Sequence, residues 1–146
     1  MGTISLQMID KKVSSLWWKE IVHYFVKVGD CFEIRCWKEE ITEIKQASLY
    51  GSTNDDKNEV SVKGIVSEEL LNELLSENPS DKSLYNKMTK YFTINIENEK
   101  CNFCSAHYGT ELYLMNVSDE DFKFFEKVMK LYSDCFSIHI EKEYEE

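Results

Sequence analysis

Hydrophobic side chains recur every three or four residues in three stretches of the chain, as on one face of an α-helix. These stretches are residues 14–28, 67–78 and 118–132. In the first stretch the residues expected on the apolar face are Leu16, Trp17, Ile21, Tyr24, Phe25 and Val28. Ser67 is followed by Glu68 and Glu69, and carboxylates in a first turn complement the helix dipole. Ser118 is followed three residues later by Asp121, an acidic relative of the capping box. The spacing therefore predicts three helices.

Hydrophobic and polar residues alternate in six other stretches, which is typical of strands with one face in the core. These are residues 31–37, 59–66, 91–97, 100–108, 110–117 and 135–141. Residues 91–117 are expected to form three consecutive antiparallel strands, because only short turns separate their segments. In the first stretch the even-numbered residues are expected to face the core, so Trp37 shares the opposite face with Glu33 and Arg35.

The remaining segments carry weaker patterns. Residues 38–50 fit both a helix and a strand, and we expect a strand that ends near Tyr50. Residues 51–58 (GSTNDDKN) are turn-forming and are predicted to be an exposed loop. One or two helical turns are expected within residues 80–90, and the acidic C-terminal tail is expected to fray. These elements predict one α+β domain over residues 1–146, with about three helices packed against a mainly antiparallel sheet.

The charge balance decides against one large class of partner. Asp and Glu number 27 against 17 Lys and Arg, which gives a formal net charge of -10. Proteins that bind nucleic acids place cations against phosphates, so nucleic acids would repel this chain. The same field attracts basic proteins and speeds their docking. The alternative is that the acidity only keeps the protein soluble.

We expect a cytoplasmic location without membrane contact, because charged residues interrupt every apolar run of the chain. No signal-peptide pattern opens the chain, and no apolar run approaches the ~20 residues that span a bilayer. In a reducing compartment the five cysteines are expected to be free thiols. We therefore predict no structural disulfide.

The sharpest chemical motif is Cys101-Asn102-Phe103-Cys104 followed by His107, which matches part of a tetrahedral zinc site. A zinc site needs a fourth ligand, and in a strand the two cysteines would point to opposite faces. The sequence contains no Gly-rich phosphate loop, no Gly-x-Ser-x-Gly and no His-Glu-x2-His. We therefore expect no metal, no cofactor and no catalytic residues, and we predict that the protein is not an enzyme.

A partner-binding surface is the remaining candidate site. Trp37 shares a predicted strand face with charged residues, and an exposed tryptophan among charges is a typical interface anchor. Eight acidic residues around this strand, the predicted loop and the next helix start are expected to face a basic partner. They are Glu33, Glu39, Glu40, Asp55, Asp56, Glu59, Glu68 and Glu69. The alternatives are that Trp37 packs under a neighbouring loop and that the carboxylates form a solvated face.

Three stretches of the chain carry a family resemblance. They are Leu16-Trp17-Trp18-Lys19-Glu20-Ile21, residues 30–37 and residues 108–116. Together with the size and acidity, they resemble the small immunity proteins of bacterial contact-dependent growth inhibition systems. The resemblance implies a cytosolic inhibitor that binds the toxic C-terminal domain of a cognate effector, often a nuclease, and blocks its active site. The alternatives are an acidic regulatory or scaffold module with another protein partner, and a small metal-dependent or thiol enzyme.

Overall fold

Strands and helices follow one another in short succession along the chain. The computed structural model describes residues 1–10, 13–79 and 87–143. Its strands are β1 (Gly2–Met8), β2 (Cys31–Trp37), β3 (Ser52–Asp56), β4 (Glu59–Ile65), β5 (Thr93–Glu97), β6 (Asn102–Ala106), β7 (Glu111–Val117) and β8 (Phe136–Lys142). Its helices are α1 (Leu16–Phe25), α2 (Ile41–Ser48), α3 (Glu68–Ser76) and α4 (Asp119–Met129), with a short 3-10 helix, η1 (Lys130–Cys135), after α4. The helical turns predicted within residues 80–90 fall mainly on residues 80–86, which lie outside the described residues, as does the end of the tail.

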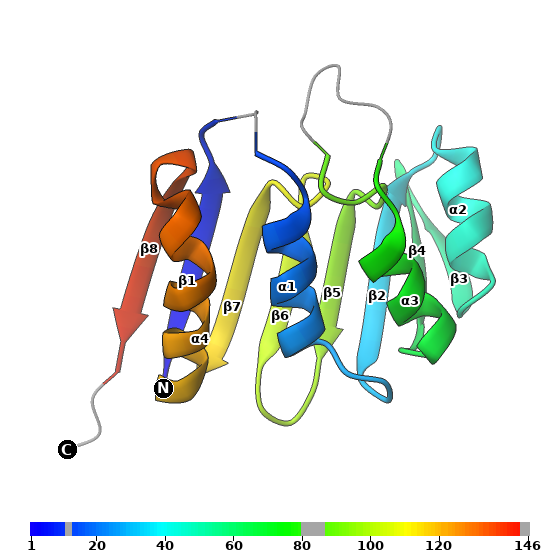
Figure 1. The fold of residues 1–146 in the computed structure, drawn as a ribbon. Coiled ribbons are helices and arrows are strands. Elements are labelled where there is room, and N and C mark those ends of the chain that lie inside the picture. The colour runs from blue at the N-terminus through cyan, green and yellow to red at the C-terminus, as the bar shows by residue number, and fades with distance from the viewer. Residues whose placement is uncertain (11–12, 80–86, 144–146) are drawn as a thin grey trace.

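The eight strands of the described chain form one antiparallel sheet in the order β3-β4-β2-β5-β6-β7-β1-β8. The prediction of three consecutive antiparallel strands is confirmed by β5, β6 and β7. β1, which the sequence analysis missed, lies between β7 and β8 (Figure 1). Its signal was the alternation of buried Ile4 and Leu6 with the more exposed Thr3 and Ser5.

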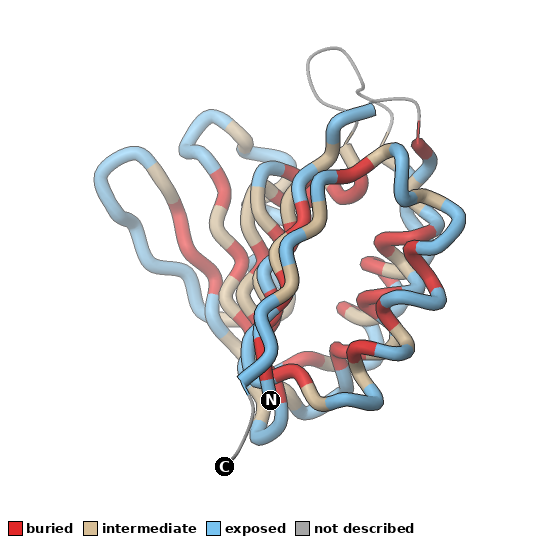
Figure 2. The backbone as a smooth tube through the Cα atoms, turned by 90° about the vertical axis from the view of Figure 1, so that its left-hand side faces the viewer, coloured by how far each residue is buried: buried red, intermediate tan, exposed pale blue. Residues whose placement is uncertain are grey.

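The helices of the described chain lie on one face of this sheet, and the opposite face carries no helix (Figure 2). α1, α3 and α4 cover the middle and one end of the sheet, and α2 packs against β2 and β4 at the other end (Figure 1). The class is α+β, as predicted, and the described ranges contain four α-helices rather than about three. A one-sided helix layer leaves alternate side chains of every strand uncovered.

The core between the sheet and the helices is built around two tryptophans of α1. Trp17 and Trp18 are fully buried, and both indole N–H groups have partners. Trp17 Nε1 donates to the sulfur of Met88 at 3.2 Å, and Trp18 Nε1 donates to Ser105 Oγ at 3.1 Å. Burying indoles with satisfied N–H groups avoids the cost of an unpaired donor. The predicted buried face of this helix was partly wrong, because Leu16 is exposed and Trp18 lies inside.

Two predictions for residues 38–58 were wrong. The predicted strand ending near Tyr50 is α2, since Ala47 is buried and Ile44 packs beside it one turn earlier on the helix face. The predicted loop at residues 51–58 contains β3 and the turn to β4. Every residue of β3 is exposed, so backbone pairing with β4 holds this edge strand and its side chains give no hydrophobic pattern.

Two helix starts confirm the capping predictions. Ser67 Oγ accepts a hydrogen bond from the N–H of Leu70 at 3.1 Å. Ser118 Oγ accepts from the N–H of Asp121 at 3.2 Å, and the Asp121 carboxylate accepts from the N–H of Ser118 at 3.1 Å. This reciprocal capping box fixes where α4 begins, directly after β7.

Candidate protein-binding face

Side chains that point away from the helices form the uncovered face of the sheet, called here the open face. On β2 they alternate with the buried Phe32, Ile34 and Cys36, which confirms the predicted orientation of that strand. The middle of the open face is made by residues of β2, β5, β6 and β7. They are Cys31, Glu33, Arg35, Trp37, Thr93, Asn95, Glu97, Asn102, Cys104, Glu111, Tyr113 and Met115. Three large apolar side chains stand exposed among them, namely Trp37, Tyr113 and Met115.

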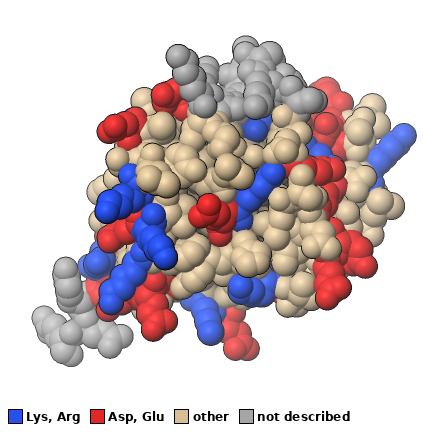
Figure 3. Space-filling view, viewed as in Figure 1, with Lys and Arg blue, Asp and Glu red and all other residues tan. Residues whose placement is uncertain are grey.

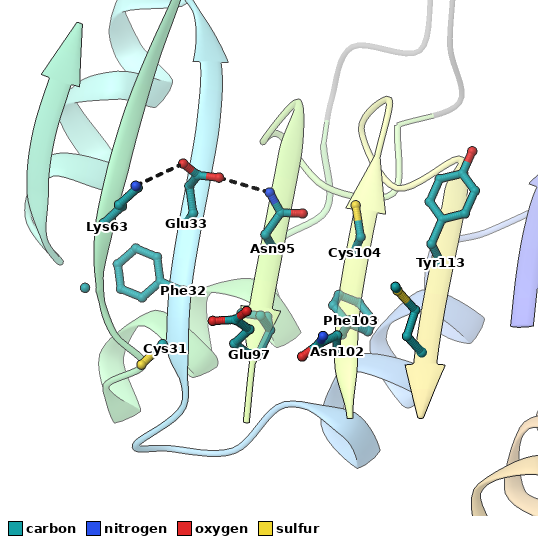
Figure 4. Close-up of a pocket in the computed structure, with 13 residues that line it drawn as sticks. Cys31, Phe32, Glu33, Lys63, Asn95, Glu97, Asn102, Phe103, Cys104 and Tyr113 are labelled. Carbon is teal, nitrogen blue, oxygen red and sulfur yellow. Dashed lines mark hydrogen bonds and ion pairs between the residues drawn. The ribbon is translucent and has the colours of Figure 1, made fainter. Parts of the chain in front are cut away.

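A groove of about 660 Å³ crosses the open face. Two neighbouring cross-strand rows line it, and the sheet register defines both rows (Figure 4). One row is Lys63, Glu33, Asn95, Cys104 and Tyr113, and the other is Cys31, Glu97, Asn102 and Met115. Adjacent strands lie ~4.8 Å apart, so a groove from β4 to β7 is roughly 19 Å long. We call it the cross-strand groove.

Arg35 gathers three carboxylates at the β2–β4–β3 end of the open face. Its guanidinium lies 3.3 Å from Glu33 Oε2, 3.2 Å from Asp56 Oδ2 and 3.3 Å from Glu59 Oε2. The hydrogen bond to Glu59 raises the pKa of Arg35 above its ordinary value. Glu33 also accepts from Asn95 Nδ2 at 3.1 Å. The single arginine therefore orders three of the predicted partner-binding carboxylates and neutralises part of their charge.

Trp37 lies at the end of β2, and its side of the open face is aromatic. It is 38% exposed, and its ring centroid is 4.9 Å from that of Phe92. Phe92 in turn makes edge contacts with Tyr108 at 5.2 Å and His107 at 5.5 Å. Trp37 was expected either to anchor an interface or to pack under a neighbouring segment. The structure allows both, because one side of the ring packs on Phe92 and the other is free to contact a partner.

The turn that carries His107 and Tyr108 has an unusual backbone. His107, Tyr108 and Gly109 have φ values of 50°, 60° and 85°, a left-handed run that L-residues with a Cβ seldom adopt. Tyr108 donates its N–H to the Phe92 carbonyl at 3.0 Å, and its own carbonyl accepts from Met88 N at 2.8 Å. These bonds hold the strained turn beside Trp37. Strain of this kind is concentrated at functional sites in proteins.

The other predicted partner-binding residues are divided: Glu39 and Glu40 lie beside Trp37, whereas Asp55, Glu68 and Glu69 lie away from the open face. Glu39 lies in the turn after β2, and Glu40 accepts hydrogen bonds from Trp37 N at 2.9 Å and Tyr108 Oη at 3.1 Å. Asp55 pairs in register with the inward-facing Val60, so it projects from the sheet edge toward the helix side. Glu68 and Glu69 begin α3 just after Ile65, which pairs with Cys31 at the opposite end of β2 from Trp37.

Net negative charge is concentrated in one part of the sequence. Residues 31–77, which form β2, α2, β3, β4 and α3, hold 11 acidic and five basic residues. This third of the chain therefore carries six of the ten net negative charges. On the helix-covered face both signs are interspersed, with acidic side chains gathered over α2 and α3 (Figure 3). We call residues 31–77 the acidic segment, and it contains every predicted partner-binding residue.

The cysteine motif is divided between the two faces of the sheet. Cys101 is buried in the core, whereas Cys104 on β6 lines the cross-strand groove. Among the described residues no group of three His, Cys, Asp or Glu side chains is placed to hold a metal ion. Burial raises the pKa of Cys101 to about 11 and that of Cys36 to about 12, and it also raises the pKa of Cys104. Such thiols stay protonated and are poor nucleophiles at neutral pH.

Fold and face together define an α+β protein with a one-sided antiparallel sheet and an uncovered, partly aromatic face in an acidic setting. No family model, curated protein or solved structure matches the chain. Within the described ranges, none of the helices has the length and apolar character needed to cross a membrane.

Proposed function

We propose that this protein is an immunity protein: it binds the toxic C-terminal domain of a contact-dependent growth inhibition effector in the cytoplasm and neutralises it. The partner is a basic domain of the nuclease class. One observation supports this most strongly, namely an uncovered sheet face that exposes Trp37 beside carboxylates of the acidic segment, with Tyr113 and Met115 exposed farther along the same face on β7. Aromatic and Met side chains are enriched in protein interfaces, and a rim of charge supplies selectivity.

The charge of the chain favours a basic protein over nucleic acid as the partner. A nuclease domain needs a positive groove for phosphates, and a surface with net negative charge can occupy that groove in place of the substrate. Glu33, Asp56 and Glu59 are already positioned by Arg35, so little side-chain freedom is lost when a partner cation reaches them. This pre-organisation supports inhibition by occupation of the site, without any chemical step.

Trp37 is the proposed anchor of the interface. Its indole is partly exposed, rests on Phe92 and lies two residues beyond Arg35 along β2. Removal of a desolvated tryptophan from an interface costs about 2–4 kcal/mol, which is roughly a 30- to 1000-fold loss of affinity. Because the ring is not part of the buried core, the substitution is expected to leave the fold intact.

The test is co-expression with the effector domain encoded by the adjacent upstream gene, followed by titration calorimetry on the purified pair. A one-to-one complex that blocks toxin activity is expected, and Trp37→Ala should weaken it at least 30-fold. Leu49→Ala is the control, since it truncates another exposed apolar side chain, 74% exposed, after α2 on the helix side. It should change affinity less than about threefold.

Two results would contradict the proposed function, and a third would contradict the proposed interface. Progressive inactivation of the toxin by a substoichiometric amount of this protein would make it an enzyme. A tight complex with some other basic protein, and none with the adjacent effector domain, would make it the acidic regulatory or scaffold module instead. If Trp37→Ala and Leu49→Ala weakened the complex equally, the open face would not be the interface.

A further inference from the structure

The edge strand β8 has one side without a partner strand in the described chain. β8 pairs only with β1, and it lies at the end of the sheet order (Figure 1). Cys135 accepts hydrogen bonds from Ile9 N at 2.8 Å, and Glu143 N donates to the Met1 carbonyl at 2.8 Å. In an antiparallel ladder successive residues face opposite sides, so the odd-numbered residues of β8 bond to β1. The N–H and C=O groups of its even-numbered residues therefore point outward.

The two edges of the sheet differ in how they are protected. β3, at the far edge, has the sequence STNDD, and its two aspartates and fully exposed side chains discourage pairing with another strand. β8 is longer, contains no Pro or Gly, and pairs with β1 without a bulge. Ile138 and Ile140 on this strand are only partly buried at the sheet end. A regular, partly apolar edge of this kind is a template for strand addition.

The sequence of β8 is self-complementary around Ile140. If a second copy of β8 pairs antiparallel to the first with Ile140 on the two-fold axis, Ile140 meets its own copy and His139 lies opposite Glu141. The same His–Glu pair forms again on the other side of the axis, because the interface is isologous. These are non-hydrogen-bonded positions, where opposed side chains are closest. His139 and Glu141 are chemically matched, since their side chains already contact at 3.2 Å within one chain.

The two nearest alternative registers are less favourable. Centring the pair on Glu141 would place two carboxylates against each other on the axis. Centring the pair on His139 would place the two His139 rings against each other and leave Glu141 opposite Ser137. The outward groups of Ile138, Ile140 and Lys142 are available in each register, so the side chains decide among them. The Ile140-centred register makes two His–Glu pairs, in which the imidazole and the carboxylate can form an ion pair or a hydrogen bond. The His139-centred register replaces them with two Ser–Glu hydrogen bonds and sets the two imidazoles against each other.

We propose that two copies of this protein pair through β8, with the two-fold axis at Ile140, and join their sheets into one continuous antiparallel sheet. The axis of such a pair is perpendicular to the sheet, so both helix layers lie on one side and both open faces on the other. The cross-strand groove and Trp37 stay uncovered. This inference is independent of the proposed function, because it uses none of the same side chains.

The test is sedimentation equilibrium on the full chain between about 1 and 200 µM. A monomer–dimer equilibrium is expected. Ile140→Lys places two cations on the axis and should raise the dimer dissociation constant more than tenfold. Asn54→Lys, on the opposite sheet edge, is the matched control and should leave it unchanged. Circular dichroism of each variant shows whether the fold is kept.

A charge exchange tests the register itself. Glu141→Lys should weaken the dimer about tenfold, because both copies of the pair become unfavourable. The double variant His139→Glu with Glu141→Lys restores opposite charges across the axis and should regain most of that loss. A protein that is monomeric throughout the range, or a dimer indifferent to Ile140→Lys, would overturn the proposal. A double variant no better than Glu141→Lys alone would refute the Ile140-centred register.

Discussion

Glu73 is the most deeply buried carboxylate among the described residues. Its side chain on α3 is 7% exposed. It accepts hydrogen bonds from Tyr91 Oη at 2.9 Å and from Lys90 Nζ at 2.7 Å. Tyr91 is itself fully buried, and its burial, together with the charge of Glu73, raises its pKa far above the ordinary value. The pair thus ties α3 to the segment that leads into β5.

Glu73→Ala should destabilise the fold by about 3 kcal/mol. The change removes two hydrogen bonds to a charged group and leaves the Tyr91 hydroxyl buried without its acceptor, which alone costs ~1–3 kcal/mol. Lys90 is less affected, because it keeps its contact with Glu77 at 2.8 Å. The Glu77 side chain is 49% exposed, so Glu77→Ala should cost no more than about 0.5 kcal/mol.

Urea unfolding followed by tryptophan fluorescence measures both variants, and a double-mutant cycle with Tyr91→Phe isolates the bond between Tyr91 and Glu73. Tyr91→Phe should cost about 1–1.5 kcal/mol in the natural background, but in the Glu73→Ala background it should recover stability, because it removes the hydroxyl that has lost its acceptor. If Glu73→Ala costs no more than Glu77→Ala, the buried pair contributes nothing beyond a surface ion pair. A coupling energy near zero would refute the reasoning for Tyr91.

Three further outcomes follow from particular residues. Gly109→Ala should lower the free energy of unfolding in urea by more than about 2 kcal/mol, because φ is positive there and a Cβ would lie 2.7 Å from Met88 Cβ. Gly29→Ala, where φ is also positive but the space is open, should lower it by only about 1 kcal/mol. Folding raises the pKa of the Cys36 thiol from 9.0 to about 12, so between these values only the unfolded thiol ionises. The contribution of Cys36 to stability should therefore be constant below pH 9 and should fall by up to about 1.4 kcal/mol per pH unit from pH 9 to about pH 12. Cys36→Ala should flatten this fall. Neutralising Glu39 and Asp55, which make no ion pair in the described chain, should slow toxin association at low salt, whereas Glu59→Gln should mainly speed dissociation.

Periodicity predicted the parts of the fold whose side chains alternate between core and solvent. β2, β4 and the three consecutive strands β5 to β7 were found because their inward residues are apolar and alternate with mainly polar outward residues. β3 was missed for the opposite reason, since none of its side chains is buried. A strand held by backbone pairing alone has no hydrophobic pattern, so only its neighbour in the sheet reveals it.

The helix α2 shows a second limit of pattern analysis. Its eight residues bury only Ala47 fully, so the apolar positions are too few to separate a period of 3.6 from a period of 2. Tertiary packing decided the outcome, because a helix brings Ile44 and Ala47 onto the same core contact. Short amphipathic segments are generally fixed by their neighbours rather than by intrinsic propensity.

The candidate site was predictable as a list of residues but not as a surface. Strand alternation correctly placed Glu33, Arg35 and Trp37 on one side of β2. That Arg35 would gather carboxylates from β3 and β4 depended on a strand pairing that the sequence pattern did not contain. Tyr113 and Met115 were not singled out either, although their alternation with buried leucines on β7 carried the signal.

The two proposals fit together because the sheet separates their surfaces. β2 lies five strand positions from β8 in the sheet order, so pairing through β8 would put the two β2 strands eleven spacings apart. At ~4.8 Å per spacing this is roughly 50 Å, wider than a small toxin domain. Each Trp37 could then bind its own partner without contact between the two. The dimer would keep one toxin domain per copy, and the affinity of each site would not depend on whether β8 is paired.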